Sequence, residues 1–91
     1  MNLKLVTLGG VKLEEAVYSV TIPTIDGEIS VLPSHEPLVT VAKDGVITVR
    51  RRQEDSDNQL EYFAISGGVV KIDYLSVQIL VDEAEDRRAH V

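Results

Sequence analysis

The chain has 91 residues, of which 44% are hydrophobic and 26% charged, so it forms one small domain with a single core. It has no cysteine and only two histidines, which excludes disulfides, thiolate zinc sites and imidazole clusters. The net charge of -6 disfavours nucleic acid and anionic lipid as direct partners, and no apolar stretch approaches the roughly 20 residues that a membrane-spanning helix needs.

Alternation of polar and apolar residues with period two predicts strands along most of the chain. In the run 15–22, Ala16, Tyr18, Val20 and Ile22 share one face, and in the run 76–82 the aliphatic side chains at 77, 79 and 81 face inward. Turn-forming residues such as glycine, proline and aspartate separate the runs. The predicted strands are 3–7, 15–22, 28–31, 38–41, 46–50, 60–65, 69–73 and 76–82. Many short strands at this spacing predict an all-β fold, either a sandwich or a barrel.

The end of the chain is the one segment that is typical of a helix. In residues 82–90 acidic side chains precede basic ones, an order that suits the helix dipole. The segment is shorter than the roughly 12–15 residues at which an isolated helix becomes marginal in water. We therefore expect at most a short C-terminal helix, with a sandwich domain at 1–82 and a short charged tail at 83–91.

No combination of residues indicates catalysis or metal binding. Ser34, His35 and Glu36 have the residue types of an acyl-transfer triad, but triad members converge from separate elements and consecutive residues diverge. Gly67 and Gly68 are not followed by the Lys-Ser or Lys-Thr pair of a phosphate-binding loop, so a turn or bulge is the better interpretation. The arginine triplet at 50–52 leads into a polar run that is typical of a solvated hairpin tip, and the acidic residues at 82–86 lack the spacing of a calcium loop. We expect no catalytic residue, metal or cofactor.

The segment 25–45 is the best candidate for a functional surface. It places Gly27, Pro33 and Gly45 among compact turns, with the polar side chains of Glu28 and His35 beside them. Polar groups on rigid loops suit recognition of another protein, and an ordinary sandwich edge is the equal alternative.

This segment resembles a known family. Residues 26–39, Asp-Gly-Glu-Ile-Ser-Val-Leu-Pro-Ser-His-Glu-Pro-Leu-Val, are similar to the motif of ATP synthase epsilon subunits. Three further stretches agree in order and spacing: Lys-Asp-Gly-Val-Ile at 43–47, Phe-Ala-Ile-Ser-Gly-Gly-Val at 63–69, and Val-Gln-Ile-Leu-Val-Asp-Glu-Ala at 77–84. Ser30 and Ser34 stand where the family pattern has glycine, and Asp44 where it has proline.

The resemblance implies an all-β fold, a flattened antiparallel β-sandwich of two sheets with about eight to ten short strands. It also implies a non-catalytic subunit of the F-type proton-translocating ATP synthase. Such a subunit sits in the central stalk and couples rotation of the c-ring to the γ subunit and the catalytic head, as a peripheral component on the cytoplasmic face of the bacterial plasma membrane. The matching positions imply three groups of residues: Glu28 and Ile29 toward the c-ring; Thr7, His35 and Thr40 toward γ; and Gly27, Pro33, Gly45, Gly67 and Gly68 as structural turns.

Two other classes of function are alternatives. The chain would be a free-standing β-sandwich adaptor or small-ligand module if it had no rotary partner. It would be a hydrolase only if Ser34 and His35 carried an activity that His35→Ala abolished in a folded protein.

The resemblance does not extend to the helical hairpin that follows the sandwich in this family and bears an inhibitory switch and, in some members, an ATP site. Nine residues follow Asp82, and as a helix they would reach about 13 Å. Residues 85–89 are only loosely similar to the nucleotide motif of that hairpin, so ATP binding is not expected. We expect the chain to support coupling without the inhibition that the extended helices impose.

Overall fold

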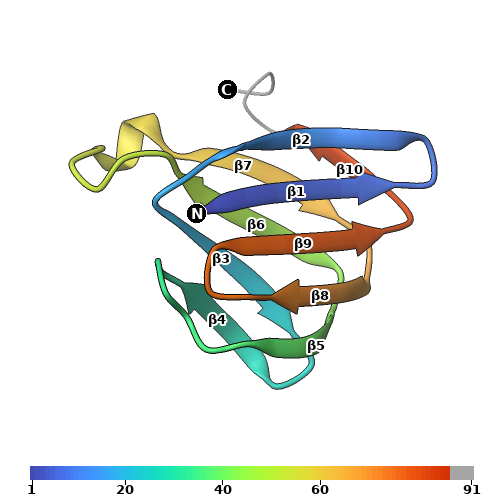
Figure 1. Cartoon of the computed structure of the whole chain (residues 1–91). Helices are drawn as coiled ribbons and strands as arrows, with labels where there is room; N and C mark the ends of the chain where they lie inside the picture. Colours follow the sequence, from blue (N-terminus) through green and yellow to red (C-terminus); the bar gives the residue numbers. More distant parts are fainter. Residues whose placement is uncertain (87–91) are drawn as a thin grey trace.

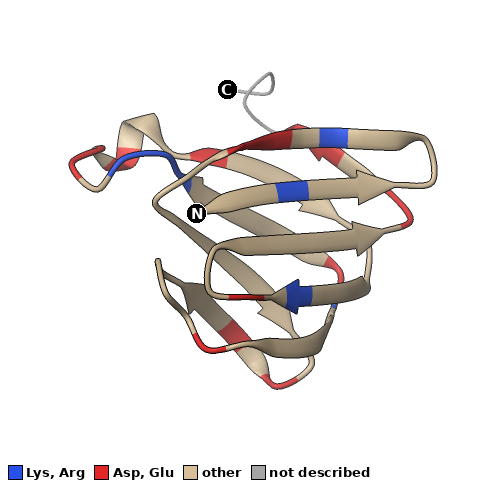
Figure 2. Cartoon of the chain, viewed as in Figure 1, with Lys and Arg blue, Asp and Glu red and all other residues tan. Residues whose placement is uncertain are grey.

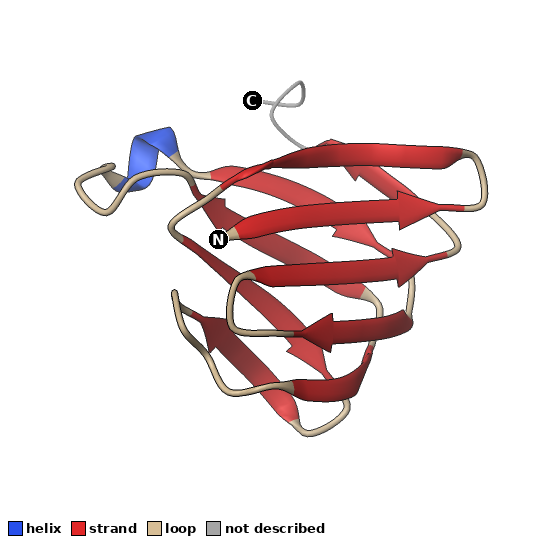
Figure 3. Ribbon diagram, in the orientation of Figure 1, coloured by secondary structure: helices blue, strands red, loops and turns tan. Residues whose placement is uncertain are grey.

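The computed structural model describes residues 1–86, which form a β-sandwich with a single 3-10 turn, η1 (Figures 1 and 3). No segment of this part of the chain is a helix with the length and apolarity needed to span a bilayer. The elements are β1 (Asn2–Thr7), β2 (Gly10–Ala16), β3 (Ser19–Thr24), β4 (Gly27–Val31), β5 (Leu38–Ala42), β6 (Gly45–Arg50), η1 (Asp57–Gln59), β7 (Glu61–Ile65), β8 (Gly68–Ile72), β9 (Ser76–Val81) and β10 (Ala84–Asp86).

The strands form two layers that are joined at one corner. Sheet 1 has the order β10-β7-β6-β3-β4, and sheet 2 has the order β5-β8-β9-β1-β2. A single pair, Thr24 opposite Ala42, connects β3 to β5 and makes the corner. Neighbouring strands are antiparallel except for β1 and β9, which run parallel. The antiparallel two-sheet sandwich that the resemblance implied is confirmed, with this one parallel pair added.

The core lies between the two sheets and is built from the alternating side chains of each strand. In β9, Val77, Ile79 and Val81 are buried as predicted, while the residues between them are exposed. The other strands contribute in the same way, and each buried Val, Leu or Ile stabilises the fold by about 1.5–3 kcal/mol relative to exposure. The fully buried members include Leu3, Leu5, Val20, Ile22, Ile47, Val49, Val70 and Ile72.

The predicted strand 15–22 is wrong as a continuous element. β2 ends at Ala16 and β3 begins at Ser19, because the chain crosses from sheet 2 to sheet 1 between them. The crossing is held by backbone bonds, since the Val17 N–H donates to the Met1 carbonyl at 2.8 Å and the Tyr18 N–H to the Arg50 carbonyl at 2.8 Å. Residues 10–14 of β2 were not predicted; β2 is an edge strand in which no residue is fully buried.

The helix predicted over 82–90 is also wrong in its described part. Residues 84–86 form β10, which pairs with β7 at the edge of sheet 1. Two bonds between Ser66 and Glu83 start this pairing: the Ser66 N–H donates to the Glu83 carbonyl at 3.0 Å, and the Glu83 N–H donates to Ser66 Oγ at 2.9 Å. The open edge of β7 therefore outweighs the weak helical preference of a short acidic segment. Residues 87–90 of the predicted helix lie outside the described residues.

Candidate protein-interaction surface

Most of the predicted turn residues gather at one end of the sandwich. This end carries five turns: β1–β2, β3–β4, β5–β6, β7–β8 and β9–β10. We call it the glycine end, because four glycines lie in or beside these turns: Gly9, Gly27, Gly45 and Gly67. Pro33 lies at the opposite end, in the loop between β4 and β5.

Two of the predicted glycines have a clear physical requirement. Gly27 opens β4 with φ of 108°, a conformation that disfavours other residues. A Cβ on Gly68, the first residue of β8, would collide with the carbonyl group of Leu80 on β9. These positions fix the geometry of the glycine end.

The structure places the three residues expected near γ in different settings. Thr7 ends β1 and is 8% exposed; its Oγ1 accepts the Gly9 N–H at 3.1 Å and donates to the Gly10 carbonyl at 3.4 Å, so it holds the β1–β2 turn. Thr40 is half-buried in β5 opposite the buried Val70. His35 lies in the β4–β5 loop at the other end of the molecule. The three residues therefore form no single cluster.

The two residues expected near the c-ring lie together on β4. Glu28 is exposed and Ile29, half-buried, packs against the core. Both are close to the β3–β4 turn, where Thr24 Oγ1 donates to the Gly27 carbonyl at 2.6 Å and accepts the Asp26 N–H at 3.2 Å. The carboxylate of Glu28 is thus carried by a short, well-braced hairpin.

The hydrolase alternative has no support in the geometry. Ser34 and His35 lie in one loop, and His35 Nδ1 lies 2.6 Å from the backbone carbonyl oxygen of Glu36 rather than from a hydroxyl. Within residues 1–86, no three His, Asp or Glu side chains are placed to share a metal ion.

A hollow of about 650 Å³ opens at the glycine end. It lies between β2 and β10, and its wall carries Lys12 together with the acidic side chains of Asp44, Asp82, Glu83 and Glu85. Ala64, Ile65, Ser66 and Ala84 supply most of the rest of the wall. The hollow is a polar surface depression between two edge strands.

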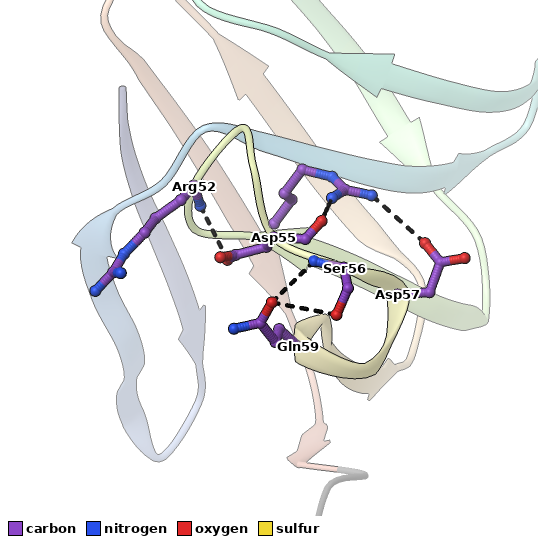
Figure 4. Close-up of polar contacts among 6 residues, drawn as sticks. Arg52, Asp55, Ser56, Asp57 and Gln59 are labelled. Atoms are coloured by element: carbon purple, nitrogen blue, oxygen red, sulfur yellow. Dashed lines mark hydrogen bonds and ion pairs between the residues drawn. The ribbon is translucent and has the colours of Figure 1, made fainter.

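The β6–β7 loop protrudes from the far end and is ordered by its own side chains (Figures 1 and 4). The Arg52 N–H donates to Asp55 Oδ2 at 3.1 Å, and the Ser56 N–H donates to Gln59 Oε1 at 2.9 Å. Arg50 Nη1 donates to the Asp55 carbonyl, and Arg50 Nη2 lies 3.7 Å from Asp57 Oδ1. The polar run at 50–59 is therefore a structured hairpin tip, as the sequence indicated.

The outer face of sheet 2 carries a continuous line of aliphatic side chains, which we call the apolar row. Register places its members directly opposite one another across five adjacent strands. Val41, Val69 and Leu80 are 44–46% exposed and Val11 is 53% exposed. The row consists of Val41, Val69, Leu80, Val6 and Val11, in the order β5, β8, β9, β1 and β2.

The apolar row is bordered by a shallow hollow at the glycine end and by a mainly polar line of side chains on the other side. Leu8, 87% exposed, extends it at the glycine end, and a shallow hollow of about 190 Å³ lies between Val6, Leu8 and Leu80. The neighbouring line across the same strands is mainly polar and consists of Val39, Lys71, Gln78, Lys4 and Glu14. An apolar centre with a polar rim is the usual anatomy of a protein–protein interface.

Sequence reasoning missed the apolar row, although a signal for it was present. Apart from Thr40, the segments 38–42 and 79–81 consist of apolar residues on both faces of their strands, whereas a strand with one solvated face alternates. That signal indicates a second covered face, but only the register shows that the outward residues align.

These features define a class: a small two-sheet β-sandwich whose described residues carry an extended apolar row on one outer face. Comparison with known proteins specifies the family. The family described as "ATP synthase, Delta/Epsilon chain, beta-sandwich domain" matches residues 1–87, and the chain belongs to this family.

Individual relatives agree. The chain is 40% identical over 85 residues to the ATP synthase epsilon chain of Moorella thermoacetica, and 38% identical over 84 residues to that of a Sulfurovum species. These matches cover 93% and 92% of this chain but 60% and 62% of the relatives. The chain thus spans about three fifths of the length of the curated relatives it matches.

Solved structures give the same fold. One similar structure is a chain of the Euglena gracilis mitochondrial ATP synthase, from a structure of OSCP, F1 and the c-ring. The TM-score is 0.82 and the sequence identity 29%, and the match covers 92% of this chain and 51% of that chain. A chain of the Tetrahymena thermophila central stalk and c-ring structure has a TM-score of 0.77 at 20% identity, over 97% of this chain and 67% of that one, which supports the fold alone.

Proposed function

We propose that this chain acts as the sandwich part of an epsilon subunit in the central stalk of an F-type ATP synthase. In this role it performs no chemistry. It transmits rotation of the c-ring to γ and the catalytic head, as a peripheral component on the cytoplasmic face of a bacterial plasma membrane. Family membership and the names of the relatives support the proposal.

The apolar row is the observation that carries the proposal. A subunit that transmits torque needs a firm attachment to the shaft, and desolvated aliphatic contacts supply most of the affinity of such attachments. We assign the apolar row to γ. Thr7 follows Val6 and Thr40 precedes Val41, so the side chains of both threonines point to the inner face of sheet 2, and His35 lies beyond the opposite end of the sheet. A γ contact that includes these residues would therefore involve the backbone of Thr7 and Thr40 and the loop that carries His35.

The c-ring is assigned to the β3–β4 hairpin. Glu28 presents an exposed carboxylate there, which suits a charge-assisted contact with a basic side chain of the ring. Ile29 anchors the strand in the core and thereby holds Glu28 in place.

Co-purification with γ tests the central claim. We compare Leu80→Asp with Val46→Asp, because both replace an aliphatic side chain of similar exposure, 45% and 42%, on the outer faces of opposite sheets. Leu80→Asp should lower affinity for γ at least about tenfold, since a buried hot spot contributes 1.4 kcal/mol or more. Val46→Asp should bind γ like the unchanged chain. Equal binding by both variants, with equal thermal stability, would show that the apolar row is not the attachment surface.

A further inference from the structure

The free edge of β4 has an unusual property that follows from Pro23. β4 pairs residue by residue with β3, and Pro23 stands opposite Glu28. Proline has no N–H, and the Pro23 carbonyl accepts the Lys43 N–H at 3.1 Å, away from β4. The pair Pro23 and Glu28 is therefore a non-hydrogen-bonded pair of the antiparallel ladder.

Because Pro23 and Glu28 form a non-hydrogen-bonded pair, the direction of every backbone N–H and C=O group in β4 is determined. In an antiparallel ladder, hydrogen-bonded and non-hydrogen-bonded pairs alternate, so the N–H and C=O of Gly27, Ile29 and Val31 point to β3. Those of Glu28 and Ser30 point the opposite way, to the free edge. Within residues 1–86, β4 pairs with no strand except β3, and no backbone hydrogen bond from Glu28 or Ser30 to a loop is found.

The side chains around this edge make it selective for a positive partner. Between Lys12 and Lys43 the sequence has no lysine or arginine, and Figure 2 shows β3, β4 and the loop after β4 with acidic positions and no basic ones. Asp26, Glu28 and Glu36 are all exposed in this region. A second copy of the chain would bring like charges together, whereas a basic segment would be attracted.

We propose that the free edge of β4 pairs with a short extended segment of the c-ring that carries a lysine or arginine. The backbone groups of Glu28 and Ser30 form ladder hydrogen bonds with that segment, and the Glu28 carboxylate pairs with its basic side chain. The inference rests on the proposed contact between the β3–β4 hairpin and the ring, and it adds the mode of binding and the part played by Ser30.

Amide hydrogen exchange tests the pairing directly. The chain is exchanged alone and bound to detergent-solubilised c-ring from the same organism, then quenched, and exchange is read residue by residue. The amides of Glu28 and Ser30 should slow at least about tenfold in the complex, because a bonded edge amide exchanges only through opening. The Ile29 amide points to β3 and serves as an internal control that should be protected in both states.

A pair of variants tests the same bond by binding. Ser30→Pro removes the outward N–H while leaving the ladder to β3 complete, and Ser30→Ala keeps the N–H and removes only the hydroxyl. Ser30→Pro should weaken ring binding about five- to tenfold, the loss of one hydrogen bond to a neutral partner, and Ser30→Ala should not. The exchange experiment decides the matter if Ser30→Pro fails to fold.

The outcomes separate the two proposals. Ring binding with unchanged exchange at Glu28 and Ser30 would overturn the edge pairing and leave the proposed ring contact standing, through side chains alone. Absence of ring binding by the unchanged chain would overturn both.

Discussion

Arg51 Nη2 lies 2.7 Å from Glu15 Oε2, and this ion pair joins the two sheets at the end opposite the glycine end. Glu15 belongs to β2 of sheet 2, and Arg51 directly follows β6 of sheet 1. The same guanidinium also pairs with the buried Glu61 of β7, donating from Nε to Oε2 and from Nη2 to Oε1, the latter at 3.2 Å. The two layers are therefore connected by charge where no strand pairing links them.

Arg51→Ala should destabilise the fold, because it leaves the 6% exposed Glu61 side chain without this cation. The expected loss is about 1–3 kcal/mol, below that of a fully buried pair because Arg51 is itself 44% exposed. Urea unfolding measures the change. Arg52→Ala is the control, since its backbone N–H keeps the Asp55 bond, and it should stay within about 0.5 kcal/mol. Equal effects of the two variants would contradict a specific role for the Arg51 pair.

Ser34→Gly should stabilise the protein. Ser34 has φ of 65°, the left-handed region in which glycine avoids a steric cost of about 1–2 kcal/mol, part of which is offset by the greater freedom of glycine in the unfolded chain. A net gain of about 0.5–1 kcal/mol is expected in thermal or urea unfolding. Ser56→Gly is the matched control, because Ser56 has φ of -75° and caps η1, so it should give no gain.

Gly68→Ala should destabilise the fold by about 2 kcal/mol or more, since the new methyl group meets the Leu80 backbone across the β8–β9 pair. Gly9→Ala provides the comparison. A Cβ there would lie 3.6 Å from Thr7 Oγ1, an ordinary contact, so the stability should change by less than about 1 kcal/mol. A similar loss for both glycines in urea unfolding would refute the close-approach explanation.

Glu28→Lys should weaken binding to the c-ring while leaving the unfolding free energy within about 0.5 kcal/mol, because an exposed carboxylate contributes little to the core. The control is Glu54→Lys, which makes the same charge change in the exposed β6–β7 loop at the far end. Ring affinity and thermal stability are measured for both. If Glu28→Lys lost stability and binding in parallel, Glu28 would be a structural residue.

Much of the fold could be predicted from local patterns. Alternation identified the inward face of β9, and glycine, proline and aspartate residues lie in or beside the breaks between strands. The composition alone excluded thiolate and disulfide chemistry. The motif at 26–39 pointed to the family that the comparison then showed. All these properties depend on residues that are close together in the chain.

Other features depended on the tertiary structure. β10 is a strand because β7 offers it an open edge, although its own sequence is typical of a short helix. The apolar row exists only because register aligns aliphatic residues of five strands, and the Arg51 pair spans residues that are 36 and 10 positions away, Glu15 and Glu61. Local periodicity predicts which face of its own strand each side chain lies on. Which strands become neighbours, and in which register, is decided by long-range packing of the whole core, and that packing places the binding surface on the molecule.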